Sequence, residues 1–394
     1  MVQVIKKILF ITGTRADYGK LKSLIKALEA SDGFEAYIFV SGMHLISKYG
    51  CTYKDIIKDG YKNIYLAEDI GYSEKMDVNL ANTIKSFSLY ASRIKPDLIV
   101  VHGDRIDALA GAIVGMLNNI RVAHIEGGEI TGTVDESIRH AVSKMVHLHF
   151  VANEESKMRL IQLGEPERNI YVIGSPDIDI MMSADLPRLE DVKSRYEILF
   201  DKYAIFIYHP VTTEENMLEK NIREVIRAVQ LSGKNYVIIY PNNDLGSDTI
   251  INQLKTIRDD SRYKLFPSLP VEDFLALLKN SDFIIGNSSA GIRESCVYGV
   301  PAVDIGTRQR NRYPKGFLAN IMHADENMDC IKNCIDHVDN YRYKSNYYGN
   351  GKSAELFLNI IKSKYIYRQD LQKHFVDLDS TQQAIENYIN EVCF

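Results

Sequence analysis

Short apolar runs alternate with amphipathic stretches along the first half of the chain. Residues 7–11 form a continuous apolar run after one lysine, which is typical of a central parallel strand covered on both faces. Leu21, Leu24, Ile25 and Leu28 follow with the i, i+3, i+4, i+7 spacing of an amphipathic helix. The alternation continues with expected strands at 36–40, 98–101, 122–125 and 148–151 and helices over 76–94 and 138–147. Repeated strand–helix units predict a doubly wound parallel sheet.

A second series of the same kind begins after a pause near residue 174 and a charged stretch that ends near residue 202. Its strands are expected at 204–208, 236–240, 264–266, 283–285 and 302–305. A length of 394 residues suits two domains. We therefore expect an α/β protein with two Rossmann-like, doubly wound parallel-sheet domains that face a cleft. Residues 1–177 form the first domain and 178–377 the second, and a terminal helix within 378–394 packs back on the first.

Composition and charge limit the partners that this chain can have. The net charge of −5 excludes a general attraction to nucleic acid or anionic lipid, so any bound anion needs a local site. No apolar run reaches the roughly 18 residues of a membrane-spanning helix. The five cysteines are scattered without the spacing of a metal site. We expect a cytoplasmic protein with reduced thiols, no metal, and no nucleic-acid or membrane partner.

The loop after the first expected strand, residues 13–19, opens the first helix. Its glycines let the backbone approach a ligand closely, and the start of a helix offers amide groups to an anion. Arg15 adds a planar cation suited to a pyrophosphate. A simpler interpretation is equally open here, in which the glycines only shape a turn and Arg15 caps a neighbour.

Acidic residues recur where the strands of the first half end. Asp104 follows the strand at 98–101, Glu126 follows the strand at 122–125, and Asp135 comes shortly before the next helix. The carboxyl ends of parallel strands meet at one rim of a sheet, and carboxylates gathered in a partly desolvated site can exchange protons. One such residue alone would more simply cap a helix. Three in register favour an acid–base role.

The second half offers a site for a nucleotide. A histidine follows its first strand, and a segment of small and hydroxyl residues lies between the strand at 283–285 and the next helix. Such a segment can surround an anion, a nearby glutamate can accept hydrogen bonds from a ribose diol, and an arginine returns in the following loop. The residues expected to hold a nucleoside diphosphate are His209, Ser288, Ser289, Gly291, Glu294 and Arg308.

Ten segments of the chain carry a common pattern. They are GTRADYGKL (13–21), GMHL (42–45), HGDR (102–105), HIEGGE (124–129), GTVDESIRH (132–140), GSPD (174–177), HPVTTE (209–214), YPNND (240–244), NSSAGIRE (287–294) and GVPAVDIGTRQRNR (299–312). In this order they resemble the hydrolysing UDP-N-acetylglucosamine 2-epimerases of sialic acid biosynthesis. The resemblance covers residues 7–354. It implies a GT-B-type pair of domains with the substrate in the cleft, a reaction without metal or cofactor, and a homo-oligomer, either a dimer or a tetramer.

The resemblance also implies roles for single residues. The positions that match those holding UDP are Arg15, His209, Ser288, Ser289, Glu294 and Arg308, and the expected UDP site also includes Gly19 and Gly291. The positions that match the catalytic, sugar-side residues are His44, Asp104, Glu126 and Asp135, and His209 joins them at the leaving group. Gly19 departs from the pattern, because some relatives carry a serine there that touches the nucleotide. Binding at this position would then rest on the backbone amide.

The reaction implied by the resemblance consumes water. UDP-N-acetylglucosamine would lose UDP to give a glycal, and hydration of the glycal would release N-acetylmannosamine. We expect Glu126 and Asp135 to transfer protons and Asp104 to activate water or orient the sugar. The nearest alternatives are a non-hydrolysing epimerase and the same hydrolysis of UDP-2,4-diacetamido-2,4,6-trideoxyglucose. A glycosyltransferase or a sugar-nucleotide sensor could share the architecture but would not need three carboxylates.

Overall fold

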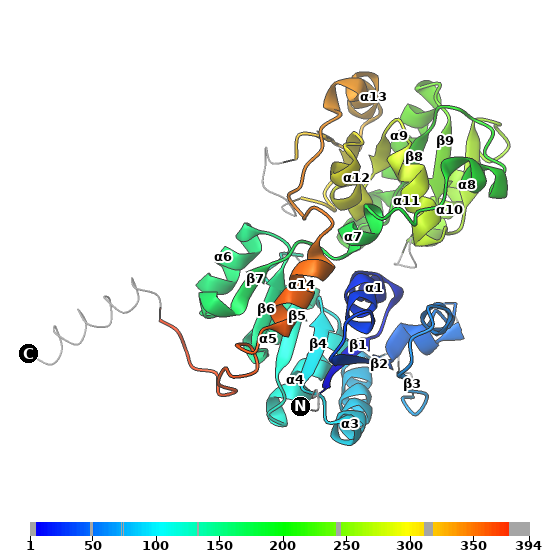
Figure 1. Cartoon of the computed structure of the whole chain (residues 1–394). Helices are drawn as coiled ribbons and strands as arrows, with labels where there is room; N and C mark the ends of the chain where they lie inside the picture. The colour runs from blue at the N-terminus through cyan, green and yellow to red at the C-terminus, as the bar shows by residue number, and fades with distance from the viewer. Residues whose placement is uncertain are drawn as a thin grey trace, which may run out of the picture. The chain divides into compact units, whose positions relative to one another are not determined.

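The computed structural model describes residues 5–377 apart from 48–49, 72, 74, 132–133, 242–245 and 311–317. The chain divides into two compact units. The first unit contains the residues up to Asp179 together with those from Gly349 onward, and the second unit is Ile180–Tyr348. Each unit has its own parallel sheet with helices between successive strands (Figure 1).

The first unit contains a seven-stranded parallel sheet in its described residues, in the order β3-β2-β1-β4-β5-β6-β7. Its strands are β1 (Lys6–Thr12), β2 (Phe34–Val40), β3 (Ile64–Leu66), β4 (Leu98–His102), β5 (Val122–Ile125), β6 (Leu148–Val151) and β7 (Ile170–Val172). Its helices are α1 (Arg15–Glu29), η1 (Gly42–Leu45), α2 (Tyr53–Lys58), α3 (Met76–Ile94), α4 (Ile106–Leu117), α5 (Val134–Met145), α6 (Glu154–Gln162), η3 (Glu167–Asn169) and α14 (Ser353–Lys362).

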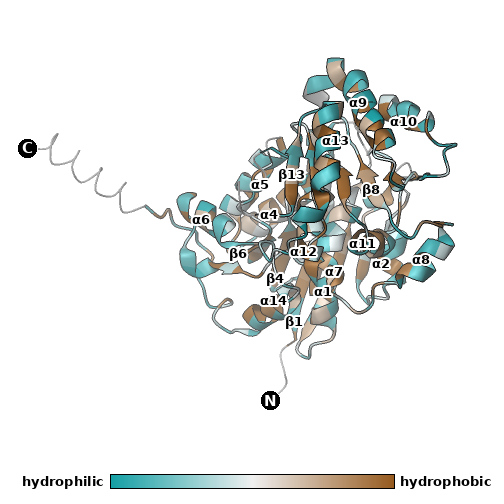
Figure 2. Ribbon diagram, turned by 90° about the horizontal axis from the view of Figure 1, so that it is seen from above, coloured by the Kyte–Doolittle hydropathy of each residue, from teal (hydrophilic) through white to brown (hydrophobic). Residues whose placement is uncertain are grey.

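Both faces of this sheet are buried, as the continuous apolar strands predict. Alternate residues of β1 face opposite sides: Phe10 packs in a cluster with α1 and α14, whereas Leu9 packs in a cluster with α3, α4 and α5. Phe357 and Ile361 of α14 are fully buried in the first of these clusters, beside α1 (Figure 1). Hydrophobic residues line the strands and the inward faces of the helices, and hydrophilic residues cover the outer faces (Figure 2).

The second unit contains a six-stranded parallel sheet in its described residues, in the order β10-β9-β8-β11-β12-β13. Its strands are β8 (Ala204–Ile207), β9 (Tyr236–Ile239), β10 (Tyr263–Phe266), β11 (Ile284–Gly286), β12 (Ala302–Ile305) and β13 (Ile321–Ala324). Its helices are α8 (Leu189–Arg195), η4 (Thr212–Met217), α9 (Leu218–Leu231), α10 (Ser247–Lys255), α11 (Val271–Lys279), η5 (Ser289–Gly291), α12 (Arg293–Tyr298), α13 (Met328–His337) and η6 (Val338–Tyr341). The remaining helix, α7 (Asp177–Met181), spans the boundary between the units. Among the described residues, no helix is long and apolar enough to cross a membrane.

Each sheet has a point where the strand order reverses. In the first unit this point lies between β1 and β4, and in the second unit it lies between β8 and β11. Ligands of doubly wound sheets bind beyond the carboxyl ends of the strands at such a point. Asp104, His209 and Ser288 lie in the loops after β4, β8 and β11, and Arg15 is the first residue of the helix after β1. The topology and the sequence motifs therefore indicate the same segments as candidates for ligand binding.

The predicted fold class of two doubly wound parallel-sheet domains is confirmed. The boundary expected after residue 177 lies two residues before the observed one, but the assignment of residues 349–377 to the second domain differs from the structure. These residues pack on the first unit because α14 supplies part of its core. The terminal helix expected within 378–394 lies outside the described residues, and the cleft between the domains stays a prediction.

Candidate active site

The loop between β1 and α1 is closed by its own aspartate. Asp17 accepts hydrogen bonds from the backbone N–H groups of Gly13 (3.0 Å) and Thr14 (2.8 Å), and the Thr14 hydroxyl accepts one from the Asp17 N–H (3.3 Å). This reciprocal pair is a capping box that fixes the start of α1. The N–H groups of Gly13 and Thr14 therefore face Asp17, and the anion-binding role expected for the helix start stays a prediction. Arg15, the first residue of α1, has an exposed side chain.

Gly13 is required by close packing. A Cβ atom at this position would lie 1.9 Å from a carboxylate oxygen of Asp107, which comes from α4 and is buried. Burial raises the pKa of Asp107 to about 6, and the Ser41 hydroxyl donates a hydrogen bond to its carboxylate. A purely structural role was the alternative that we left open for this glycine. Its close packing against Asp107 explains such a role without any ligand.

Glu126 lies directly after β5 in an unusual conformation. Its φ is +61°, in the left-handed region that side chains rarely adopt, and its N–H donates to the carbonyl of Phe150 (2.8 Å). The register of β4 with β5 brings His102 opposite Ile125, the residue before Glu126. His102 Nε2 lies 3.0 Å from Glu126 Oε2, and Glu126 is 5% exposed. The strand ends thus hold this carboxylate in a nearly dry environment.

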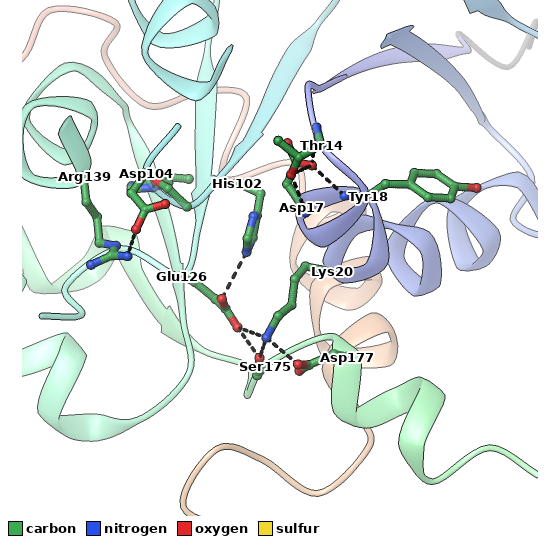
Figure 3. Close-up of polar contacts among 12 residues, drawn as sticks. Thr14, Asp17, Tyr18, Lys20, His102, Asp104, Glu126, Arg139, Ser175 and Asp177 are labelled. Carbon is green, nitrogen blue, oxygen red and sulfur yellow. Dashed lines mark hydrogen bonds and ion pairs between the residues drawn. The ribbon is translucent and has the colours of Figure 1, made fainter. Parts of the chain in front are cut away.

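Two more donors reach the other oxygen of Glu126. Lys20 Nζ of α1 lies 3.1 Å from Oε1, and the hydroxyl of Ser175 donates to the same oxygen. Lys20 also donates to Ser175 Oγ (2.9 Å) and forms an ion pair with Asp177 at the start of α7. Figure 3 shows Lys20 directed between Glu126, Ser175 and Asp177, with His102 directed to Glu126 from the opposite side.

Asp104 is held by a different partner. Arg139 of α5 forms an ion pair with it, and the same guanidinium donates to the carbonyl of Glu129 (3.1 Å) and the hydroxyl of Thr131 (3.2 Å) (Figure 3). Arg139 is buried, so this pair is protected from solvent screening. Asp135 lies in the first turn of α5, four residues before Arg139, and is half-buried. The pair therefore links the loop after β4 to the helix that carries the third predicted carboxylate.

Two further histidines of this rim support the fold. His44 is fully buried, with Nε2 3.0 Å from the Thr12 hydroxyl and Nδ1 2.7 Å from the Thr52 hydroxyl, and burial lowers its pKa. These contacts fix the ring of His44 in the fold, and its expected catalytic role stays a prediction. His124 is also fully buried, and its Nε2 donates to the carbonyl of Gly103 (2.7 Å). Burial lowers the pKa of His124 to about 3.

In the second unit one buried asparagine connects three loops. Asn287 Oδ1 accepts from the His209 N–H (2.6 Å), and its Nδ2 donates to the His209 carbonyl (2.8 Å). Its own carbonyl accepts from Arg308 Nη1 (3.1 Å) and from Nε2 of Gln309 (2.8 Å). Asn287 and Gln309 are fully buried. The loops after β8, β11 and β12, each with a predicted UDP-binding residue, are thereby fixed to one another.

The segment after β11 is a tight turn. Gly286 has φ +131°, and a Cβ there would lie 1.8 Å from the carbonyl oxygen of Ile207. The Ser288 hydroxyl accepts a hydrogen bond from the Ala290 N–H (3.3 Å) and caps η5. The predicted UDP residues of this segment that are half-buried are Ser288, Ser289, Gly291 and Glu294.

The structure adds side chains that the predicted site did not include. Lys20, His102, Ser175 and Asp177 surround Glu126 (Figure 3). Ser175 and Asp177 follow β7, so the strand-end argument used for Glu126 would have indicated them had that short strand been recognised. Lys20 lies inside a helix, where the strand-end argument does not apply, and its only signal is its place in the motif at 13–21. In the described part of the chain, no three metal-ligating side chains are grouped so as to hold a metal ion.

Comparisons with known proteins identify the family of this chain. The profile of the UDP-N-acetylglucosamine 2-epimerase family matches residues 26–362. The chain is 43% identical over 379 residues to UDP-N-acetylglucosamine 2-epimerase of Neisseria meningitidis serogroup B, across 95% of this chain and 100% of the relative. It is 34% identical to UDP-N,N'-diacetylbacillosamine 2-epimerase (hydrolyzing) of Legionella pneumophila, across 94% of this chain and 99% of the relative.

Solved structures share the fold. The crystal structure of a Neisseria meningitidis UDP-GlcNAc 2-epimerase bound to UDP-GlcNAc matches with a TM-score of 0.78 at 18% identity, across 91% of this chain and 100% of that one. At that identity the likeness concerns the architecture of paired α/β units. The assignment of the chain to a family rests on the family profile and on the 43% identical relative. The chain belongs to the UDP-N-acetylglucosamine 2-epimerase family.

Proposed function

We propose that this protein is a hydrolysing UDP-N-acetylglucosamine 2-epimerase, which converts UDP-N-acetylglucosamine and water into N-acetylmannosamine and UDP as the first step of sialic acid biosynthesis. The observation that carries the proposal is the nearly buried Glu126 carboxylate, held by donors at the carboxyl ends of the strands. Inversion at C2 requires such a base. The relative from Legionella pneumophila, named as hydrolyzing, supports the branch that consumes water.

Loss of UDP drives the first half of the reaction. The proton at C2 is not next to a carbonyl, so it becomes acidic only as positive charge develops at C1. The C1–oxygen bond breaks and its electron pair leaves on UDP, while the C2–H pair becomes the double bond of a glycal. Donors prearranged around the departing diphosphate are the largest expected catalytic contribution. The groups proposed for this are Arg15, His209, Ser288, Ser289 and Arg308, with Glu294 at the ribose and the backbone of Gly19 and Gly291 beside the nucleotide.

Hydration completes the reaction. Water adds its hydroxyl at C1, and a proton returns to C2 from the face opposite to the one it left, which gives the manno configuration. Two faces of the ring need two acid–base groups, and Glu126 and Asp135 are proposed for them. Asp104 is proposed to orient the sugar or the water, because its ion pair with Arg139 holds its carboxylate in place.

A second substrate is supported by one comparison. The 34% identical relative is named for UDP-N,N'-diacetylbacillosamine, whose 4-acetamido and 6-deoxy groups distinguish it from UDP-N-acetylglucosamine. The residues assigned above act on UDP, C1 and C2. They are therefore equally suited to either sugar, and the 43% identical relative favours UDP-N-acetylglucosamine.

The test is to incubate the protein with each UDP-sugar in D2O and to follow the products by proton NMR. The proposal predicts free UDP, a manno-configured amino sugar and deuterium at C2, with the faster rate identifying the substrate. A UDP-linked epimer without free UDP would instead assign the chain to the non-hydrolysing branch. The expected homo-oligomer is a separate proposal, and sedimentation equilibrium measures its size.

A further inference from the structure

Lys20 is an enclosed cation that connects three segments of the first unit. It comes from the second turn of α1, and its side chain is 16% exposed. Its Nζ lies 3.1 Å from Glu126 Oε1 after β5 and 2.9 Å from Ser175 Oγ after β7, and it pairs with Asp177 in α7 (Figure 3). A lysine is costly to bury unless its charge is compensated, so this position requires both carboxylates.

The contacts of Lys20 determine the state of Glu126. Lys20 and Ser175 donate to Oε1, and His102 Nε2 lies 3.0 Å from Oε2, where it can donate to an ionised carboxylate. Charge-assisted hydrogen bonds to the ionised form favour that form and fix its direction. Glu126 is thus prepared as a carboxylate before a substrate arrives.

The group formed by Lys20, Glu126, Asp177 and His102 can take up one proton and become neutral. The formal charges of Lys20, Glu126 and Asp177 sum to −1. Uptake of one proton by the Glu126–His102 pair makes the group neutral, so the proton does not create net charge in an enclosed site. Without the ammonium, Glu126 and Asp177 would lose the cation that they share, and stronger repulsion between the two carboxylates would disturb the geometry of Glu126.

We propose that Lys20 is a positioning residue of the proton-transfer site, which acts through Glu126. It keeps Glu126 ionised and directed at His102, so that the Glu126–His102 pair takes up the proton from C2. The C2–H electron pair forms the C1=C2 bond and UDP departs with the electrons of the C1–oxygen bond, while Lys20 neither gains nor loses a proton. This inference rests on the proposed function and adds a residue to its site.

The test compares Lys20→Met and Lys20→Arg with wild-type protein and with Lys22→Met. Lys22 is a matched control, since it lies on the same helix and pairs with Asp59, away from Glu126. Initial rates of UDP release give kcat and KM. We expect kcat of Lys20→Met to fall about 100-fold with KM within about threefold, as for loss of a group that acts in the transition state. Lys20→Arg should recover at least a tenth of the wild-type kcat, and Lys22→Met should match wild type within about twofold.

A double variant separates charge balance from simple support of the fold. Asp177→Asn added to Lys20→Met restores the net charge of −1, so we expect its kcat to exceed that of Lys20→Met by about fivefold or more. A kcat equal to or below that of the single variant would overturn the charge argument. A raised KM with unchanged kcat in Lys20→Met would overturn the inference too, because Lys20 would then bind the substrate itself.

The wild-type rate separates this inference from the proposed function. An active wild-type enzyme with an unimpaired Lys20→Met variant would refute the role of Lys20 alone. A wild-type protein that releases no UDP from either sugar nucleotide would refute the proposed function. Far-UV circular dichroism of every variant monitors folding, and Lys20→Arg and the double variant keep the question decidable if Lys20→Met unfolds.

Discussion

Acidification should weaken the first unit through His124. The ring is fully buried, donates from Nε2 to the carbonyl of Gly103, and lies 3.1 Å from the Ser143 hydroxyl through Nδ1. Burial lowers its pKa from 6.5 to about 3. The unfolded chain therefore binds a proton at this site more readily than the folded chain does. The stability that the neutral ring contributes is complete above pH 6.5 and is lost as the pH falls from about 6.5 towards about 3.

The size of the effect follows from the two pKa values. One pKa unit corresponds to about 1.4 kcal/mol, so at pH 5 this site lowers the free energy of unfolding by about 2 kcal/mol relative to pH 7.5. For a unit of this size that corresponds to about 4–8 °C in Tm. His147 is also buried, with its pKa lowered to about 4, and adds to the slope of the wild-type protein.

Comparison of variants isolates His124 from the other histidines. Thermal unfolding of wild type, His124→Gln and His374→Gln is followed by far-UV circular dichroism at pH 7.5 and pH 5. His374 has an exposed side chain and is the matched control. We expect the drop in Tm between the two pH values to be about 4–8 °C smaller in His124→Gln than in wild type. The drop in His374→Gln should equal that of wild type. Equal drops in all three proteins would refute the reasoning, because His124 would then titrate alike in the folded and unfolded states.

Three further predictions concern single positions. Asp135→Asn should lower kcat for UDP release by about 10²–10⁴-fold, because an amide cannot exchange the proton, and near-normal turnover would remove Asp135 from the mechanism. Arg308→Met should weaken UDP binding by about 10–100-fold in calorimetry, since a charged hydrogen bond contributes about 1.5–3 kcal/mol, and an unchanged Kd would contradict its assignment. Gly286→Ala should lower Tm sharply, because its Cβ would meet the Ile207 carbonyl oxygen at 1.8 Å. A Cβ atom at Gly19 would meet nothing within 4 Å, so Gly19→Ala should stabilise α1 by about 0.5–1 kcal/mol. Equal Tm values for Gly286→Ala and Gly19→Ala would refute the packing argument.

The central strands could be predicted from the sequence because they are apolar without interruption. The strands β5, β6 and β12 begin and end where the apolar runs do. The three strands that we did not predict, β3, β7 and β13, lie at sheet edges. They are only three or four residues long and mostly half-buried, so they are too short to stand out as buried apolar runs. The edge strand β10 was nevertheless predicted, so an edge position alone does not hide a strand.

The candidate site could be predicted only where a residue follows a strand. Glu126 and Asp104 were found in this way, and their partners were not, because Lys20 lies 106 residues from Glu126 in sequence. The role of Asp17 was missed too: it accepts hydrogen bonds from the backbone N–H groups of Gly13 and Thr14 before α1. Hydrogen bonds within a loop depend on side-chain directions that spacing does not reveal. The place of α14 was missed for a similar reason, since an amphipathic pattern does not name the surface it covers.

The late position of α14 in the chain has a consequence for synthesis on the ribosome. Phe357 packs edge-on against Phe150 of β6 at 4.9 Å between ring centroids, so the first sheet is not covered until its last helix has been translated. The contiguous second unit, Ile180–Tyr348, is complete before that moment. In a nascent chain the second unit is therefore complete before the first. A stop codon after residue 348 would leave apolar surface of the first unit exposed to chaperones and proteases, even though every predicted catalytic carboxylate had been made.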